Sequence, residues 1–214
     1  MKRYAVVGAS SGTGKRVVAQ LAASGAAVRA ISRQPVPSHG TVESYAADVT
    51  DAEAIKGALS GGFDAVFFTV DIHGKGLTRE QVKAVMLDGC VNTIAAAKAG
   101  GAGRFVLLSV MGADLPSWVW WLLNAMKPGM RDNIVKREKF LRDSGLPYVI
   151  CRAPRLTDAE NPMSVTASAP LHRMTMWRTI SRNDLARMLI SAADDAPLGT
   201  TWDVYTGKVD NAPW

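Results

Sequence analysis

Long apolar runs and clustered cysteines are both missing from this chain of 214 residues. No apolar stretch reaches the ~18 residues that a membrane-crossing helix requires, so no membrane span is expected. Cys90 and Cys151 are the only cysteines, too few for a disulfide framework, and both lie in apolar surroundings. We therefore expect two buried free thiols in a reducing compartment, the cytoplasm. Met-Lys-Arg leads directly into a strand pattern, so no signal peptide is expected.

The basic residues form no long run, although lysine and arginine outnumber the acids by 25 to 19. The resulting charge of +6 suits anionic ligands in general and does not by itself separate a phosphate-bearing cofactor from a polynucleotide. We expect a small-molecule ligand, no nucleic acid and no metal site. A hydrophobic content of 48% and a charged content of 21% are globular values, and the length suits one domain, residues 1–214.

Glycines separate a strand pattern from a helix pattern near the N-terminus. The apolar run Tyr4–Val7 leads into a loop with the spacing G-x-x-x-G-x-G, and an amphipathic helix pattern follows. Glycine lets the backbone approach a pyrophosphate closely, and a helix N-terminus offers unpaired N–H groups. The order favours a dinucleotide-binding loop over a purely structural turn. Its candidate cofactor-binding residues are Gly8, Ser10, Ser11, Gly12, Thr13 and Gly14.

An acidic residue is absent where the second strand, Ala27–Ser32, ends. Proteins that hold NAD commonly place Asp or Glu there to bind the ribose 2′-hydroxyl. Here Ser32 and Arg33 occupy the position, and an arginine can bind a 2′-phosphate through charge-assisted hydrogen bonds. Lys15, in the neighbouring loop, adds positive charge. The sequence therefore predicts NADP(H) rather than NAD(H), unless Arg33 is only a solvated strand-end residue.

Strand and helix patterns alternate along the rest of the chain. Further strands are expected at 42–46, 63–70, 104–110, 147–152 and 201–206, and capping patterns at Thr50, Thr78 and Ser181 begin three of the helices. This alternation predicts an α/β fold, a doubly wound, Rossmann-like parallel sheet with ligands at the carboxyl ends of its strands. Candidate ligand-binding residues at these ends are Asp48, Val49, Thr69, Val70 and Ser109.

Two segments depart from the alternation and are expected on the substrate side, about 111–130 and 153–180. The first contains Trp118, Trp120 and Trp121, which suit a substrate wall, a partner contact or ordinary core packing. It lacks the basic face of a membrane-surface helix. The second is a long connection, and long loops within compact domains are usually functional.

The C-terminal half adds motifs that identify a family. Glu138-x-x-Leu141-Arg142-x-Ser144 continues into Gly-Leu-Pro-Tyr-Val-Ile, and a second motif spans residues 179–186. Together with the glycine loop, these stretches resemble the atypical short-chain dehydrogenase/reductases, in their NAD(P)H-binding, NmrA-like and biliverdin/flavin-reductase-B-like branch. The resemblance covers about residues 3–206. It implies a Rossmann-like domain that binds NADP(H), with substrate between the strand ends and the segments after the fifth and sixth strands.

The resemblance also exposes a difference in the catalytic helix. Active relatives commonly carry Tyr and, four residues later, Lys, and those places are Met130 and Ile134 here. Lys136 lies two residues further on, which is about 200° around a helix, so it should point elsewhere. Catalysis by a Tyr–Lys pair is therefore not expected, although the reductase-B-like relatives also lack the pair.

Ser109 and Arg155 remain as the candidate catalytic residues. Ser109 is expected to orient a substrate carbonyl, and Arg155 to stabilise developing negative charge, unless each makes only structural or solvent contacts. His73, His172 and Asp114 are weaker candidates as proton donors. These features predict an NADPH-dependent reductase of a small activated carbonyl, imine, quinone or conjugated acceptor, acting as a monomer or homodimer. The alternatives are an NADP(H)-sensing protein that contacts a partner through residues 118–123, and a non-redox isomerase or cyclase.

Overall fold

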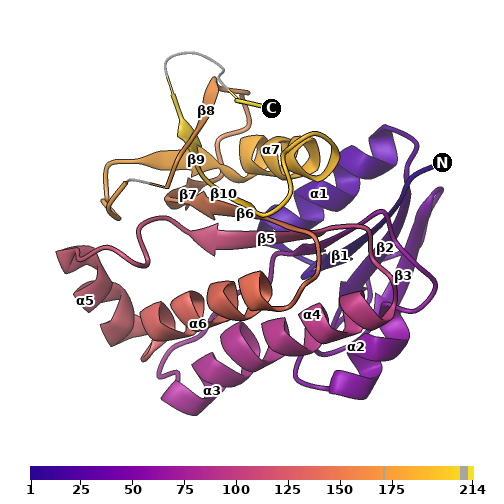
Figure 1. Cartoon of the computed structure of the whole chain (residues 1–214), viewed down its shortest axis with the longest axis horizontal. Coiled ribbons are helices and arrows are strands. Elements are labelled where there is room, and N and C mark those ends of the chain that lie inside the picture. The colour runs from indigo at the N-terminus through magenta and orange to yellow at the C-terminus, as the bar shows by residue number, and fades with distance from the viewer. Residues whose placement is uncertain (171, 208–211) are drawn as a thin grey trace.

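The computed structural model describes residues 1–170, 172–207 and 212–214, and its centre is an eight-stranded sheet with helices on both faces (Figure 1). The strand order is β3-β2-β1-β4-β5-β6-β10-β8. All neighbouring pairs are parallel except β10 with β8. The strands are β1 (Arg3–Val7), β2 (Ala27–Ser32), β3 (Val42–Ala46), β4 (Ala65–Phe68), β5 (Phe105–Val110), β6 (Tyr148–Ala153), β8 (Val165–Ser168) and β10 (Thr200–Thr206). The doubly wound parallel sheet expected from the sequence is confirmed.

Both faces of the central strands are buried, which explains their nearly unbroken apolar sequences. In β1, Tyr4 and Val6 pack on one face, while Ala5 and Val7 pack on the other. The first face is covered by α1 (Gly12–Ala23) and α7 (Arg182–Asp194), and the second by α2 (Ala52–Ala58), α4 (Gly89–Ala99) and α6 (Met130–Asp143) (Figure 1). The sheet therefore forms the middle layer of three.

Side-chain caps explain where several helices begin. Thr78 and Gln81 form the expected capping box of α3 (Arg79–Lys83), and Ser181 caps α7. The expectation for α2 needs correction, because Asp51 caps this helix and accepts from two backbone N–H groups. Thr50 instead bonds the side chain of Asp48. The helix expected from residue 78 to 99 is interrupted by a π-helical turn, η1 (Ala84–Asp88).

The two irregular segments contain more regular structure than the sequence predicted. The 153–180 connection carries β7 (Arg155–Thr157) and β8, and β7 pairs with β9 (Thr179–Ser181) in a small second sheet. The tryptophan stretch forms α5 (Trp118–Met126) at one end of the molecule (Figure 1). Among the described residues, no helix combines the length and the hydropathy needed to cross a bilayer.

Candidate functional site

A cavity of about 480 Å³ lies at the carboxyl ends of the parallel strands. Its position matches the point where the strand order reverses, between β1 and β4, which is where doubly wound folds bind ligands. The β1–α1 loop, the ends of β2 and β3, and the segment after β4 form most of the wall. The lining residues that the sequence also predicted are Gly8, Ser10, Ser11, Gly12, Thr13, Ser32, Arg33, Asp48, Val49, Thr69 and Val70.

The glycine loop has the close backbone packing that a phosphate cradle needs. Gly8 has a φ of +94° and Gly12 a φ of +55°, both in the left-handed region that glycine favours. Gly14 does not line the cavity but lies behind the loop, where a Cβ would collide with the carbonyl oxygen of Gly8 and the hydroxyl of Thr69. Gly14 therefore brings α1 close against the loop, while Gly12 leaves the cavity side open.

Unsatisfied polar groups lie where this loop enters α1. The hydroxyl of Thr13 is buried and has no hydrogen-bond partner in the described part of the chain. Ser11 makes no side-chain hydrogen bond to the start of α1, whereas Asp51, Thr78 and Ser181 cap the starts of other helices. The helix N-terminus thus presents a hydroxyl and backbone donors beside the cavity, which fits an anionic group such as a pyrophosphate.

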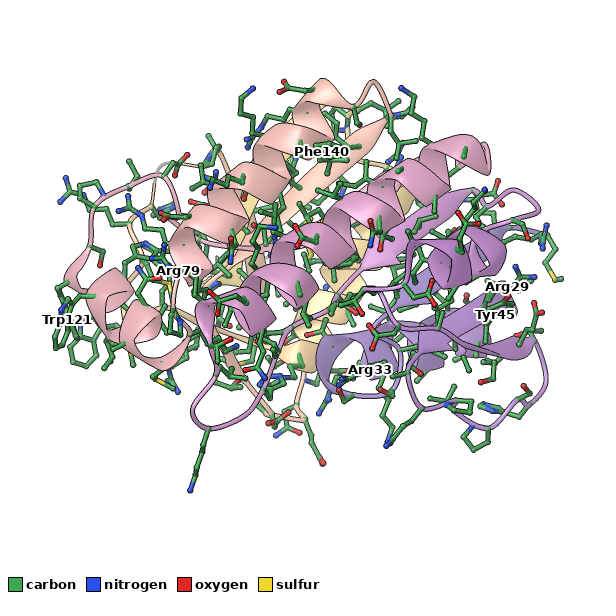
Figure 2. All side chains as sticks on the ribbon, turned by 90° about the horizontal axis from the view of Figure 1, so that it is seen from below. Arg29, Arg33, Tyr45, Arg79, Trp121 and Phe140 are labelled. Atoms are coloured by element: carbon green, nitrogen blue, oxygen red, sulfur yellow. The ribbon has the colours of Figure 1, made fainter. Side chains whose placement is uncertain are left out.

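Arg33, directly after β2, carries a positive charge that no described residue neutralises. Its side chain is exposed at the cavity, and no hydrogen bond or ion pair joins it to any described residue. By contrast, Arg29 on the same strand pairs with Glu43 and lies over the ring of Tyr45; Figure 2 shows Arg29 beside Tyr45 and Arg33 apart from both. Asp48 already accepts two hydrogen bonds from Thr50.

The segment after β4 supplies the other end of the cavity. Thr69 donates its hydroxyl to the carbonyl of Val7, which ties β4 to β1. Beyond it, the carboxylate of Asp71 accepts from Nζ of Lys127 at 2.6 Å and lies 3.8 Å from Nε2 of His73. His73 lines the cavity and is largely exposed. The remaining wall at this end is mostly apolar, formed by Val70, Ile72, Leu77, Ala84, Val85, Leu108 and Leu156.

Ser109 does not reach the cavity, and the expectation for its hydroxyl is corrected. Only 2% of Ser109 is exposed, and Oγ donates to Oε1 of Glu138 at 2.6 Å. The same carboxylate accepts two hydrogen bonds from Arg152, at 3.0 and 2.7 Å, and one from Arg142. Burial alone would raise the pKa of Glu138, but Arg152, Ser109 and Arg142 hold that pKa below its ordinary value. Ser109 therefore belongs to a buried charge cluster behind β5.

The other catalytic candidates are also occupied elsewhere. Arg155 is exposed, donates to the carbonyl of Met176 and is not among the described residues lining the cavity. Asp114 accepts from Arg152 through both oxygens. His172 bonds the buried carboxylate of Asp203, whose pKa is raised by burial. Of these candidates only His73 reaches the cavity.

The places of the relatives' Tyr and Lys are filled by side chains of an apolar cluster. Met130 and Ile134 are buried together with Val82 and Met86, and Lys136 is exposed. In the tryptophan stretch, Trp120 is buried and donates Nε1 to the carbonyl of Gly112 at 2.9 Å. Trp118 and Trp121 are 67% and 77% exposed, and Figure 2 shows Trp121 at the edge of the molecule. None of the three tryptophans lines the described cavity.

Arg182 is a charged cavity residue that sequence reasoning missed. It is the first residue of α7, and its side chain lines the cavity beside Gly12. The sequence around it reads as a helix cap, which Ser181 indeed provides. Its place at the cavity depends on the packing of α7 against α1, a contact between distant parts of the chain that no local sequence pattern predicts.

Comparisons with known proteins assign the chain to a family. The NAD(P)H-binding family matches residues 8–196. A Bacillus subtilis (strain 168) protein named "Uncharacterized sugar epimerase YhfK" is 31% identical over 141 residues, covering 64% of this chain and 60% of that protein. The match thus spans less than two thirds of that relative's length.

Solved structures share the fold over nearly the whole chain. The oxidoreductase ylbE from Lactococcus lactis has a TM-score of 0.79 at 20% identity, covering 97% of this chain and 92% of that one. A short-chain dehydrogenase/reductase from Veillonella parvula DSM 2008, in complex with NADP, has a TM-score of 0.78 at 15% identity, covering 100% and 99%. The family match decides the assignment, since these identities show the fold alone. The chain belongs to the NAD(P)H-binding family, and its fold and motifs agree with the atypical short-chain dehydrogenase/reductases of the NmrA-like branch.

Proposed function

We propose that this protein is an NADPH-dependent oxidoreductase that reduces a small activated acceptor. The observation that carries the cofactor choice is Arg33, an unpaired cation at the cavity in the position where NAD-binding proteins commonly have an acid. Solved neighbours are in complex with NADP or with NAD⁺, so the choice rests on Arg33 and not on the neighbours. When bound, the cofactor supplies a hydride from its nicotinamide ring.

The binding residues divide by position along the cavity. Gly8 and Gly12, with Thr13 and the uncapped start of α1, would hold the pyrophosphate. Arg33 would bind the 2′-phosphate through charge-assisted hydrogen bonds. A carboxylate at this position would instead repel the phosphate. The remaining contacts would come from loop and strand-end residues, while Gly14 lies behind the loop and shapes it by its packing. These other residues are Ser10, Ser11, Ser32, Asp48, Val49, Thr69 and Val70.

The scarcity of proton donors on the wall favours acceptors that need little acid catalysis. Among the described lining residues, the titratable side chains are Arg33, Asp48, Asp71, His73 and Arg182, with no tyrosine and no lysine. Such a wall suits an acceptor whose reduced form is already a stabilised anion, because its proton can come from water or from His73. Quinones, flavins, conjugated systems and activated carbonyls or imines meet this requirement.

A non-redox isomerisation is the second candidate, favoured by the name of the Bacillus subtilis relative. The exposed Trp118 and Trp121 favour a third, an NADP(H)-sensing protein that binds a partner through α5. We also infer a reducing compartment such as the cytoplasm, because both cysteines are free and fully buried, which suits a protein without disulfides.

Cofactor titration and a panel of acceptors test the proposal together. Arg33→Ala should weaken NADPH binding by about 1.5–3 kcal/mol, or roughly 10- to 150-fold, the range for hydrogen bonds to charged groups. It should leave NADH binding nearly unchanged, and Lys136→Met should affect neither cofactor. Equal losses for NADPH and NADH would contradict the role of Arg33. Tight NADPH binding without oxidation by any quinone, flavin or activated carbonyl would reject the reductase and favour sensing.

A further inference from the structure

Arg182 brings a positive charge from the C-terminal half of the chain to the glycine loop. It begins α7, which packs against α1 on the same face of the sheet. Its side chain lines the cavity, and its Nε lies 3.9 Å from the point that a Cβ on Gly12 would occupy. The guanidinium is therefore beside the part of the loop that lacks side chains.

Asp158 fixes the orientation of this guanidinium. Its Oδ2 accepts from Nη1 of Arg182 at 2.8 Å, and its Oδ1 accepts from Nη2 of Arg16 at 3.1 Å. Arg16 also donates through Nη1 to the carbonyl oxygen of Gly12 at 3.1 Å. One carboxylate thus holds two arginines, from opposite halves of the chain, around the loop. Arg182 pairs with Asp158 through Nη1, while its Nε lies near Gly12 and has no acceptor among the described residues.

We propose that Arg182 binds the pyrophosphate of the cofactor and that Asp158 positions it, an inference that rests on the proposed cofactor binding. A guanidinium has donors on more than one edge, so it can bind a carboxylate with one edge and a phosphate oxygen with another. The unpartnered hydroxyl of Thr13 and the start of α1 lie at the same end of the loop. Arg182 then provides the charge that the glycine loop itself lacks.

The two arginines at the cavity are assigned to different phosphates by their positions. Arg33 follows β2, whereas Arg182 lies beside Gly12. NADPH and NADH share the pyrophosphate, and only NADPH carries the 2′-phosphate. Loss of Arg182 should therefore weaken both cofactors equally, in contrast to loss of Arg33. Since Asp158 directly follows β7, whose Leu156 lines the cavity, cofactor binding would also stabilise the segment expected to hold substrate.

Calorimetric titration of NADPH, NADH and adenosine 2′-monophosphate tests the inference. Arg182→Ala should weaken NADPH and NADH alike, by about 10- to 100-fold. Adenosine 2′-monophosphate lacks a pyrophosphate, so its binding should not change. Arg182→Lys keeps the charge but cannot reach Asp158 and the loop at once, so its loss should be intermediate.

Asp158→Asn should weaken both cofactors by about two- to fivefold, as expected for losing a partly exposed ion pair, without a change in thermal stability. Glu160→Gln, which removes an exposed charge two residues away, and Arg187→Gln, on α7 but outside the described cavity wall, are the matched controls. A loss confined to NADPH, an equal loss for adenosine 2′-monophosphate, or no loss for Arg182→Ala would overturn the inference. Wild-type protein that binds both cofactors but reduces no acceptor would refute the proposed reductase while the binding comparison still decides the role of Arg182.

Discussion

Replacing Glu138 by glutamine removes the centre of the buried charge cluster behind β5. The carboxylate is 1% exposed and accepts four hydrogen bonds, two of them from Arg152, which is itself 3% exposed. The side-chain amide of glutamine has the same shape as the carboxylate, but its NH₂ group would face N–H groups of Arg152. Breaking a buried pair by removing one partner costs about 3–5 kcal/mol, because the other charge stays buried. At about 2–4 °C per kcal/mol for a chain of this length, the melting temperature should fall by roughly 6–20 °C.

Urea unfolding at neutral pH measures this loss, and a double variant tests its cause. If the cost comes from the buried guanidinium, which keeps only its pairing with the half-exposed Asp114, Glu138→Leu combined with Arg152→Met should be less destabilised than Glu138→Gln alone. Apolar pairs often replace buried ion pairs without loss. If the losses in unfolding free energy simply add in the double variant, the two residues are not coupled. A loss of unfolding free energy below about 1 kcal/mol for Glu138→Gln would refute the reasoning.

The pH dependence gives an independent check on the same residue. The folded-state pKa of Glu138 lies below its ordinary value of 4.5, so its contribution to stability is present above that value. The contribution is lost as the pH falls through the folded-state pKa. The difference in unfolding free energy between wild type and Glu138→Gln should therefore be constant near neutral pH and shrink below about pH 4.

Three further experiments test other parts of the structure. Gly12→Val should abolish cofactor binding by filling the cavity side of the loop, with a modest strain cost of about 1–2 kcal/mol because φ is +55°; unchanged affinity in the folded variant would exclude the loop as the phosphate site. Trp120→Ala should cost about 3–5 kcal/mol in urea unfolding, whereas Trp121→Ala, at an exposed position, should stay within about 0.5 kcal/mol. Burial raises the pKa of the Cys90 and Cys151 thiols to about 12, so neither should react with a thiol reagent at pH 8 until the protein unfolds.

The sheet and the wall of the cavity could be predicted because their signals are local in the sequence. The loop from Gly8 to Gly14 lies between a strand and a helix, and Arg33 directly follows a strand. Parallel strands with apolar sequences bring their carboxyl ends to one edge, so all the predicted residues at the ends of β1 to β4 meet around one cavity, apart from Gly14 behind the loop. The pairing of β7 with β9 joins segments that lie apart in the sequence, and neither this pairing nor the π-helical turn has a short-range sequence pattern.

The prediction that Ser109 lies at the ligand was wrong, because neighbouring residues of a strand face opposite sides of the sheet. Phe105 and Leu107 pack on the α6 side of the sheet, and with a strand period of two Ser109 must point the same way. Leu108, with the opposite parity, is the residue of β5 that lines the cavity. The period of two along β5 is therefore enough to place the Ser109 hydroxyl away from the ligand side. Because β5 offers an aliphatic side chain there, polar chemistry at that end of the cavity has to come from the segment after β4, where Asp71 and His73 lie.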